Sequence, residues 1–268
     1  MSLQHEKPVI SRTMYSICIT NYNTVGTLTR SLNSVLEQLD SSFEVVVVDN
    51  CSDDGSLEIL ENAKSKGKIR LLVRKSSRGA GRQAAFEASR GEYVIDQIDM
   101  DDFFKPAFMD LIIFYHNNFE GFLMLANGFL IAPRRLIETL GGWRDLQWGE
   151  DRDLWARAAN AGKFVYVPYE TRSWITSYRS RRFTKRIRYL YERARDCYRV
   201  ELKPYENIPK FSLKYLSSLT IAGIGYLGSR FAKRYPPHVS GWFQAEKYVP
   251  AGLELNAAGK CEELVLNL

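Results

Sequence analysis

The sequence of residues 43–56 is Phe-Glu-Val-Val-Val-Val-Asp-Asn-Cys-Ser-Asp-Asp-Gly-Ser. Its four valines form an apolar, β-branched run, which predicts a strand over residues 43–49. The acidic residues and the glycine that follow have turn and helix N-cap chemistry, so a helix is expected to begin at Ser56. A strand, a polar loop and a helix in this order form one unit of an α/β fold.

The same alternation continues on both sides of this stretch. It predicts further strands over residues 15–20, 69–73 and 93–98, and helices over residues 25–39, 56–65 and 79–89. Later in the chain it predicts one strand over residues 122–131, a helix over 151–161 and a strand over 164–167. The expected fold class is therefore α/β, with a mostly parallel sheet flanked by helices.

Composition narrows the possible kinds of site and location. The chain has 268 residues, a formal net charge of +6, four scattered cysteines and three histidines, so a zinc site is not expected. Residues 1–10 contain no apolar run, so we expect no signal peptide and a cytoplasmic protein. Residues 215–231 are weakly polar but contain three glycines, which argues against a membrane span and leaves peripheral contact with the cytoplasmic membrane face open.

Polar clusters follow three of the predicted strands, at residues 20–23, 49–54 and 99–102. Ligands in open α/β sheets bind at this end of the strands. Carboxylates gathered there repel one another unless a cation compensates them. Asp99 and Asp101, one residue apart at a strand end, therefore predict a site for Mg²⁺ or Mn²⁺. The alternative is that Asp101 and Asp102 only start a helix near Pro106.

Four motifs together carry a family resemblance. They are Ser16-Ile-Cys-Ile-Thr-Asn-Tyr-Asn23, Val45-Val-Val-Val-Asp-Asn-Cys-Ser-Asp-Asp-Gly-Ser56, Gly91-Glu-Tyr-Val-Ile-Asp-Gln-Ile-Asp-Met-Asp-Asp102 and Gly149-Glu-Asp-Arg-Asp-Leu-Trp-Ala-Arg157. Their order over residues 15–168 resembles that of the family 2 glycosyltransferases, which have the Rossmann-like GT-A fold. The resemblance implies a GT-A nucleotide-sugar-binding catalytic domain in residues 1–170 and a basic helical C-terminal region in residues 171–268.

The resemblance also implies which residues bind the donor. Asp49 matches the aspartate that binds the nucleobase, in a pocket lined by Thr20 and Tyr22. Asp99 and Asp101 match the D-x-D motif, which contacts the ribose and a metal on the donor diphosphate. We therefore expect a nucleotide-diphosphate sugar, UDP- or GDP-linked, together with Mn²⁺ or Mg²⁺.

Asp151 matches the catalytic base of the family, and Glu150 beside it either orients the acceptor or only caps the helix. The base takes the proton of the acceptor, and the metal neutralises the departing nucleotide diphosphate. Direct in-line displacement inverts the anomeric centre. The sequence thus predicts an inverting glycosyltransferase that acts on a glycan or a lipid-phosphate acceptor and has no nucleic-acid partner.

The chain departs from the family pattern in several places. Asp49 is followed by Asn50, Cys51 and Ser52 where the family has a shorter, more acidic turn, so the preferred nucleobase stays open. Residues 102–150 form a short interval with little room for an acceptor loop, and no later histidine is placed to complete a metal shell. The absence of a Q-x-x-R-W sequence argues against a processive polymerase.

Two other classes of protein fit parts of the sequence. Residues 79–84, Gly-Ala-Gly-Arg-Gln-Ala, match the G-x-G-x-x-A fingerprint of a dinucleotide-dependent oxidoreductase, although residues 74–78 separate the glycines from the preceding strand. Residues 172–199 carry ten Lys or Arg interleaved with aromatic residues, as in a non-catalytic nucleotide- or RNA-binding protein. The same basic segment also suits an anionic membrane surface.

Overall fold

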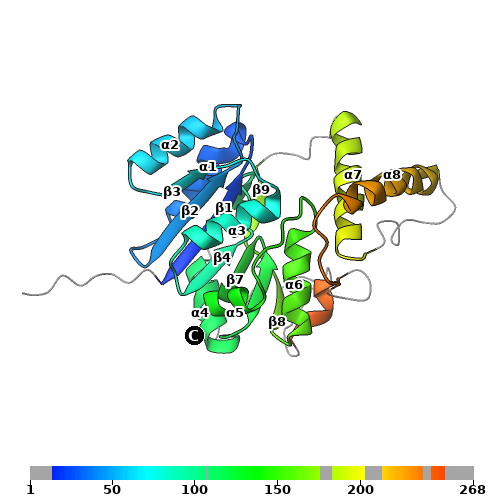
Figure 1. The fold of residues 1–268 in the computed structure, drawn as a ribbon. Coiled ribbons are helices and arrows are strands. Elements are labelled where there is room, and N and C mark those ends of the chain that lie inside the picture. Colours follow the sequence, from blue (N-terminus) through cyan, green and yellow to red (C-terminus); the bar gives the residue numbers. More distant parts are fainter. Residues whose placement is uncertain (1–13, 107, 176–182, 203–212, 238–242, 251–268) are drawn as a thin grey trace, which may run out of the picture.

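The computed structural model describes residues 14–106, 108–175, 183–202, 213–237 and 243–250. Its centre is a seven-stranded sheet in the order β3-β2-β1-β4-β7-β6-β8 (Figure 1). The strands are β1 (Tyr15–Asn21), β2 (Phe43–Asp49), β3 (Arg70–Val73), β4 (Tyr93–Asp96), β6 (Leu123–Asn127), β7 (Phe129–Pro133) and β8 (Phe164–Glu170). All neighbours pair in parallel except β7, which is antiparallel to β4 and β6. The expected mostly parallel α/β sheet is confirmed.

Helices cover both faces of the sheet. One face packs against α1 (Val25–Leu36), α2 (Ser56–Ser65) and α4 (Phe108–Asn118), and the other against α3 (Arg78–Ala88), α5 (Arg134–Thr139) and α6 (Glu150–Asn160). Successive strand residues point to opposite faces. Ile17 and Ile19 accordingly belong to the first core, whereas Cys18 between them belongs to the second. Both faces of β1 are buried, which explains why its sequence is apolar without alternation.

The predicted single strand over residues 122–131 is wrong. The structure has a hairpin there, with Gly128 between β6 and β7 in the left-handed region at φ 82°. A Cβ at this position would also lie 2.4 Å from Cδ of Arg172, so a side chain is excluded on two grounds. The two strands are buried in succession, so the apolar run reads as one strand, and the sign of the turn is the Asn127-Gly128 dipeptide.

A small second sheet extends the fold beyond the main one. It pairs β5 (Asp102–Phe104) with β9 (Arg172–Trp174) in antiparallel register. The alternative that Asp101 and Asp102 start a helix is therefore wrong, because α4 begins only at Phe108. The predicted division at residue 170 stays a prediction, but β9 lies after it and packs with the first part of the chain.

The expected helical C-terminal appendage is present. It consists of α7 (Phe183–Arg199) and α8 (Leu213–Arg230), which pack against each other at one side of the body (Figure 1). A short 3-10 helix, η1 (Ala245–Tyr248), returns to β8. No helix in the described ranges combines the length and apolarity needed to cross a bilayer.

Candidate functional site

The loops after β1 and β2 are joined through Asp49, whose side chain is fully buried. Its Oδ1 accepts hydrogen bonds from Nδ2 of Asn21 at 2.8 Å and from the Ser52 hydroxyl at 2.7 Å, and its Oδ2 accepts one from the Ser52 backbone N–H at 2.8 Å. Oδ1 therefore joins the two loops, and Oδ2 fixes the loop after β2. The expected contact between Asp49 and a nucleobase stays a prediction.

Thr20 and Tyr22 lie at the same carboxyl edge of the sheet, at the end of β1 and just after it. Thr20 is half-buried and packs against the N-terminus of α3, where its Cγ2 lies 3.1 Å from the position that a Cβ of Gly81 would occupy. Tyr22 is 57% exposed and is free to contact a ligand above the sheet edge. The role of Thr20 and Tyr22 in a nucleobase pocket stays a prediction.

The segment after β4 carries a cluster of three carboxylates, those of Asp99, Asp101 and Asp102. One oxygen atom from each lies within 4.8 Å of the others. The Thr27 hydroxyl of α1 donates to the Met100 carbonyl at 2.7 Å, which fixes the segment against that helix. Burial raises the pKa of Asp102 to about 6, and burial and the charge of Asp99 raise the pKa of Asp101. The sequence predicted two of these carboxylates and missed Asp102.

Arg172 of β9 partly neutralises this acidic cluster. Its Nη1 pairs with Oδ2 of Asp102 and lies 3.4 Å from Oδ2 of Asp99. The other oxygen of Asp102, Oδ1, is buried and has no hydrogen-bond partner among the described residues. An unsatisfied buried carboxylate oxygen beside two further carboxylates is the donor set that a hard divalent cation prefers, so these residues fit a Mg²⁺ or Mn²⁺ ion.

Arg82 of α3 connects the acidic cluster to the start of α6. Its side chain is buried, and its Nε lies 3.0 Å from Oδ1 of Asp151 and 3.6 Å from Oε1 of Glu150. Its Nη1 pairs with Asp96, and its Nη2 lies 3.9 Å from Oδ1 of Asp99. Burial alone lowers the pKa of Arg82, but the carboxylates, Asp151 first, raise it well above its usual value. Sequence reasoning missed Arg82, because nothing in the helix pattern marks which arginine turns inward.

Glu150 and Asp151 open α6 and occupy different environments. Gly149 precedes them in the left-handed region at φ 74°, which turns the chain into the helix. The Glu150 side chain is 4% exposed and that of Asp151 is 21% exposed. Burial and the charge of Asp151 raise the pKa of Glu150 to about 8, so Glu150 keeps its proton at neutral pH. Asp151 is therefore the more accessible carboxyl group of the pair, the one that a substrate can reach.

Asp153 fixes the loop that precedes these two residues. It is buried, with Oδ1 2.8 Å from Nη1 of Arg144 and Oδ2 2.7 Å from Nη2 of Arg157. The same Arg157 guanidinium also donates to the Gly142 carbonyl at 2.7 Å. Residues 142–153 are thus held as one unit, which determines where Asp151 stands.

The two glycines of the G-x-G-x-x-A segment have a packing role. A Cβ at Gly79 would lie 1.9 Å from the Arg144 carbonyl oxygen, and a Cβ at Gly81 would lie 3.1 Å from Cγ2 of Thr20. Both glycines therefore let α3 approach the loops that carry the site. The segment starts inside α3, which Ser77 caps by accepting a hydrogen bond from the Ala80 N–H at 3.1 Å. This arrangement speaks against the dinucleotide-binding fingerprint, which needs its first glycine in a tight strand-to-helix turn.

The model of glycosyl transferase family 2 matches residues 16–120, a segment that contains Asp49 and the whole acidic cluster. No curated protein sequence matches the chain.

Several solved structures share the fold. The 1–349 fragment of TarS from S. aureus, in complex with UDP-GlcNAc, is 20% identical with a TM-score of 0.55, over 81% of this chain and 72% of that one. Mannosyltransferase PcManGT from Pyrobaculum calidifontis, in complex with GDP-Man and Mn²⁺, is 17% identical with a TM-score of 0.54, over 84% of this chain and 77% of that one. Glucosyl-3-phosphoglycerate synthase from Mycobacterium tuberculosis, in complex with Mn²⁺, UDP and phosphoglyceric acid, is 18% identical with a TM-score of 0.51, over 65% of this chain and 73% of that one.

These structures establish the GT-A fold for the chain, and the family model covers three of its four sequence motifs. Glu150, Asp151 and Arg172 lie after the matched segment, and the fold brings them to the motifs inside it. Residues 16–120 of the chain are therefore similar to glycosyl transferase family 2, and the chain shares its fold with these transferases.

Proposed function

We propose that this protein is an inverting glycosyltransferase that moves a sugar from a UDP- or GDP-linked donor to an acceptor hydroxyl or phosphate. The observation that carries the proposal is the Arg82 guanidinium, which lies 3.9 Å from Asp99 in the acidic cluster and 3.0 Å from Asp151. A transferase needs its donor-binding group and its base held at a fixed separation. The UDP-GlcNAc and GDP-Man present in two structures of the same fold support this donor class.

Donor binding is assigned to two groups of residues. Thr20 and Tyr22 would contact the nucleoside, Asp49 would hold the loops that form its pocket, and Asp99, Asp101 and Asp102 would hold Mn²⁺ or Mg²⁺. The free Oδ1 of Asp102 supports the second assignment, as does the Mn²⁺ in two similar structures. A bound divalent ion would neutralise charge on the diphosphate leaving group.

The chemical step is assigned to Asp151. The acceptor oxygen attacks the anomeric carbon, the bond from that carbon to the diphosphate oxygen breaks, and Asp151 takes the acceptor proton. One direct displacement inverts the configuration of that carbon. Glu150 is protonated at neutral pH and nearly inaccessible, so its role is to position Asp151 and Arg82. Arg82 contacts both carboxylates and fixes their orientation relative to the donor site.

The exposed face of α8 supports contact with an anionic membrane, and hence a lipid-linked acceptor. Ile224, Leu227 and Phe231 are 55%, 62% and 94% exposed, and their spacing of three and four residues places them on one side of the helix. The basic residues Arg230 and Lys233 lie beside them. An apolar stripe with basic neighbours suits an interfacial helix on anionic lipid. Part of the predicted basic segment, residues 176–182, lies outside the described residues.

A thermal-shift panel tests the proposed function. UDP, GDP and their sugars would each be added with Mn²⁺ or with EDTA, because a ligand that binds only the native state raises its apparent stability. At a concentration about 100 times the dissociation constant the gain is about 2.7 kcal/mol, which is a shift of several degrees. One nucleotide should stabilise the protein with Mn²⁺ more than with EDTA. If no nucleotide raises the melting temperature under either condition, the proposal is wrong.

A further inference from the structure

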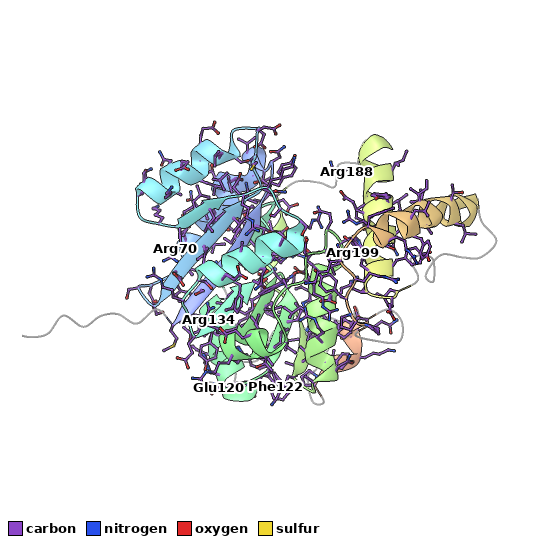
Figure 2. The ribbon with its side chains drawn as sticks, in the orientation of Figure 1. Arg70, Glu120, Phe122, Arg134, Arg188 and Arg199 are labelled. Atoms are coloured by element: carbon purple, nitrogen blue, oxygen red, sulfur yellow. The ribbon has the colours of Figure 1, made fainter. Side chains whose placement is uncertain are left out.

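A pocket lies between the catalytic body and the helical appendage. It has a volume of about 370 Å³ and is lined by Ser77, Asp145 and Gln147 from the body, Arg188, Glu192, Arg195 and Arg199 from α7, and Ala232 and Lys233 after α8. Figure 2 labels two of these residues, Arg188 and Arg199, on α7. None of the three clustered aspartates and neither Glu150 nor Asp151 lines it. It is therefore a separate subsite.

The lining of this pocket carries an excess of positive charge. Four of its side chains are cationic and two are acidic. Glu192 pairs with Arg188 at 2.9 Å, but the Arg188 side chain remains 78% exposed, so the pair is solvated and easily exchanged. Lys233 forms no ion pair within the described ranges, and its Nζ lies 5.4 Å from the centre of the Tyr235 ring. Two cations thus remain available to an incoming anion.

The other two cations are held rigidly by one buried acid. Asp196 is fully buried and accepts from Nε of Arg195 at 2.8 Å and from Nη1 of Arg199 at 3.1 Å. It also accepts from the backbone N–H of Gln147 at 2.7 Å and of Trp148 at 3.1 Å. The arginines are therefore fixed relative to the loop that leads to Asp151. Preorganised guanidinium groups are the usual means by which proteins recognise phosphate.

Two residues of the pocket lining, Gln147 and Arg188, interact with residues around the candidate site. Gln147 accepts a hydrogen bond at 3.3 Å from the backbone N–H of Arg78, whose charge acts on both Asp101 and Glu150. Hydrogen bonding and charge from Glu192 raise the pKa of Arg188, and Tyr22 adds to the same shift, which places Arg188 within electrostatic reach of the β1 loop. The pocket is therefore coupled electrostatically to the donor edge, and it shares the loop of residues 142–153 with Asp151.

We propose that this pocket binds a phosphate group of the acceptor, so that the acceptor is a phosphorylated molecule. That the ligand is an acceptor rests on the proposed glycosyltransferase function, whereas the phosphate site itself does not depend on that function. The donor diphosphate is accounted for by the acidic cluster and its cation. A second basic site that shares the Asp151 loop therefore serves the other substrate. The phosphate either belongs to a free phosphate ester or is the headgroup of a lipid.

Binding measurements at low salt test the site with two probes, glycerol 3-phosphate and monomeric dihexanoyl phosphatidic acid. The pocket variant is Arg188→Gln with Lys233→Gln, because both side chains are exposed and their loss should not affect folding. The control variant is Arg90→Gln with Lys66→Gln, which removes two exposed cations far from the pocket. At least one probe should bind, and the pocket variant should bind it on the order of tenfold more weakly than the control, since two charge-assisted hydrogen bonds are lost.

The outcomes distinguish a free phosphate ester from a lipid headgroup, and they distinguish failure of the phosphate site from failure of the glycosyltransferase function. Binding of glycerol 3-phosphate identifies a free phosphate ester, and binding of the lipid alone identifies a lipid headgroup. If neither probe binds, or if both variants bind equally well, the phosphate site is wrong. If the pocket variant also loses nucleotide binding measured with Mn²⁺, the pocket belongs to the donor and the acceptor assignment is overturned. If no nucleotide binds the wild-type protein while phosphate binding still depends on the pocket, the glycosyltransferase function fails and the phosphate site stands.

Discussion

The Nε atom of Arg82 lies 3.0 Å from Oδ1 of Asp151, yet neither atom has a hydrogen-bond partner in the described part of the chain. The two charged groups are thus in contact without the alignment of an N–H donor and its acceptor. The Arg82 guanidinium is held from its other side by Asp96, which is fully buried. Asp151 is therefore placed by charge, and its oxygen atom keeps its capacity to accept a proton or a hydrogen bond from a substrate.

Asp151→Asn should abolish sugar transfer and leave nucleotide binding nearly unchanged. An amide cannot take a proton from the acceptor, and a general base contributes about 100- to 10,000-fold to a rate. Single-turnover transfer and nucleotide calorimetry would be measured side by side. Asp110→Asn, at an exposed position in the first turn of α4, is a matched control and should retain full activity. Turnover near that of the control would assign the base to another residue, with Glu150 the next candidate.

Asp101→Asn should weaken metal-dependent nucleotide binding. The exposed carboxylate of Asp101 is the member of the acidic cluster that a bound ion and a diphosphate reach from solvent. We expect a loss on the order of tenfold, because one charge-assisted ligand is removed. Calorimetry with Mn²⁺ and with EDTA would be compared for the wild type and the variant. Equal binding of the nucleotide to the wild-type protein in EDTA would rule out the metal.

Arg172→Gln should destabilise the protein and make its stability depend on added metal. Asp102 is buried and pairs with Arg172, so the substitution leaves a buried carboxylate without its cation, at a cost of about 1–3 kcal/mol. Mn²⁺ bound at Asp99 and Asp102 should restore part of this loss. Urea unfolding with and without Mn²⁺ measures both effects. A variant as stable as the wild type, or one that Mn²⁺ does not stabilise, would contradict the assignment of these carboxylates.

Stability should fall as pH rises from about 4.5 to about 8, because the folded state binds more protons than the unfolded chain in this window. Burial raises the pKa of Glu150 from 4.5 to about 8 and that of Asp96 from 3.8 to about 7. An acid whose pKa is raised on folding costs stability once it ionises, so the loss is complete above the folded pKa.

Glu150→Gln tests this dependence. The amide stays neutral, so the variant should gain about 4 kcal/mol relative to the wild type between pH 5 and pH 9. Urea unfolding at pH 5, 7 and 9 measures the difference. The exposed Glu138→Gln is the control and should follow the wild-type curve. Parallel curves for Glu150→Gln and the wild type would show that Glu150 ionises normally.

Leu227→Ser with Phe231→Ser should release the protein from anionic vesicles. Both side chains are more than half exposed, so the fold should tolerate the change. Vesicles of phosphatidylglycerol and phosphatidylcholine would be sedimented at low and high salt. Each nearby cation contributes about 1 kcal/mol, and salt should reverse binding by screening these charges. Val73→Ser with Ile113→Ser removes two exposed apolar side chains of the catalytic body and should have no effect. If the wild-type protein stays in the supernatant at low salt, the membrane contact is wrong.

The sequence by itself determined the α/β class, the order of the first elements and the residues at the carboxyl ends of the strands. These features are local, since β-branched runs, turn residues and helix caps act over a few positions. The ends of β1, β2 and β4 could be predicted to meet because parallel strands share one edge. The position of Asp49, Asp99 and Asp101 at one sheet edge was therefore predictable, whereas Glu150 and Asp151 entered through the family resemblance, and their roles stay predictions.

Only the tertiary structure decided which charges face one another. The partners of Arg82 come from β4, the loop after it and α6, and Arg172 reaches Asp102 through a two-stranded sheet that joins segments 70 residues apart. The basic pocket likewise needs α7, the segment after α8 and the loop before α6. Such pairings depend on long-range packing, which places a few side chains of a helix or strand inward. The local sequence pattern shows that an arginine is present but not which carboxylate it will contact in the folded chain.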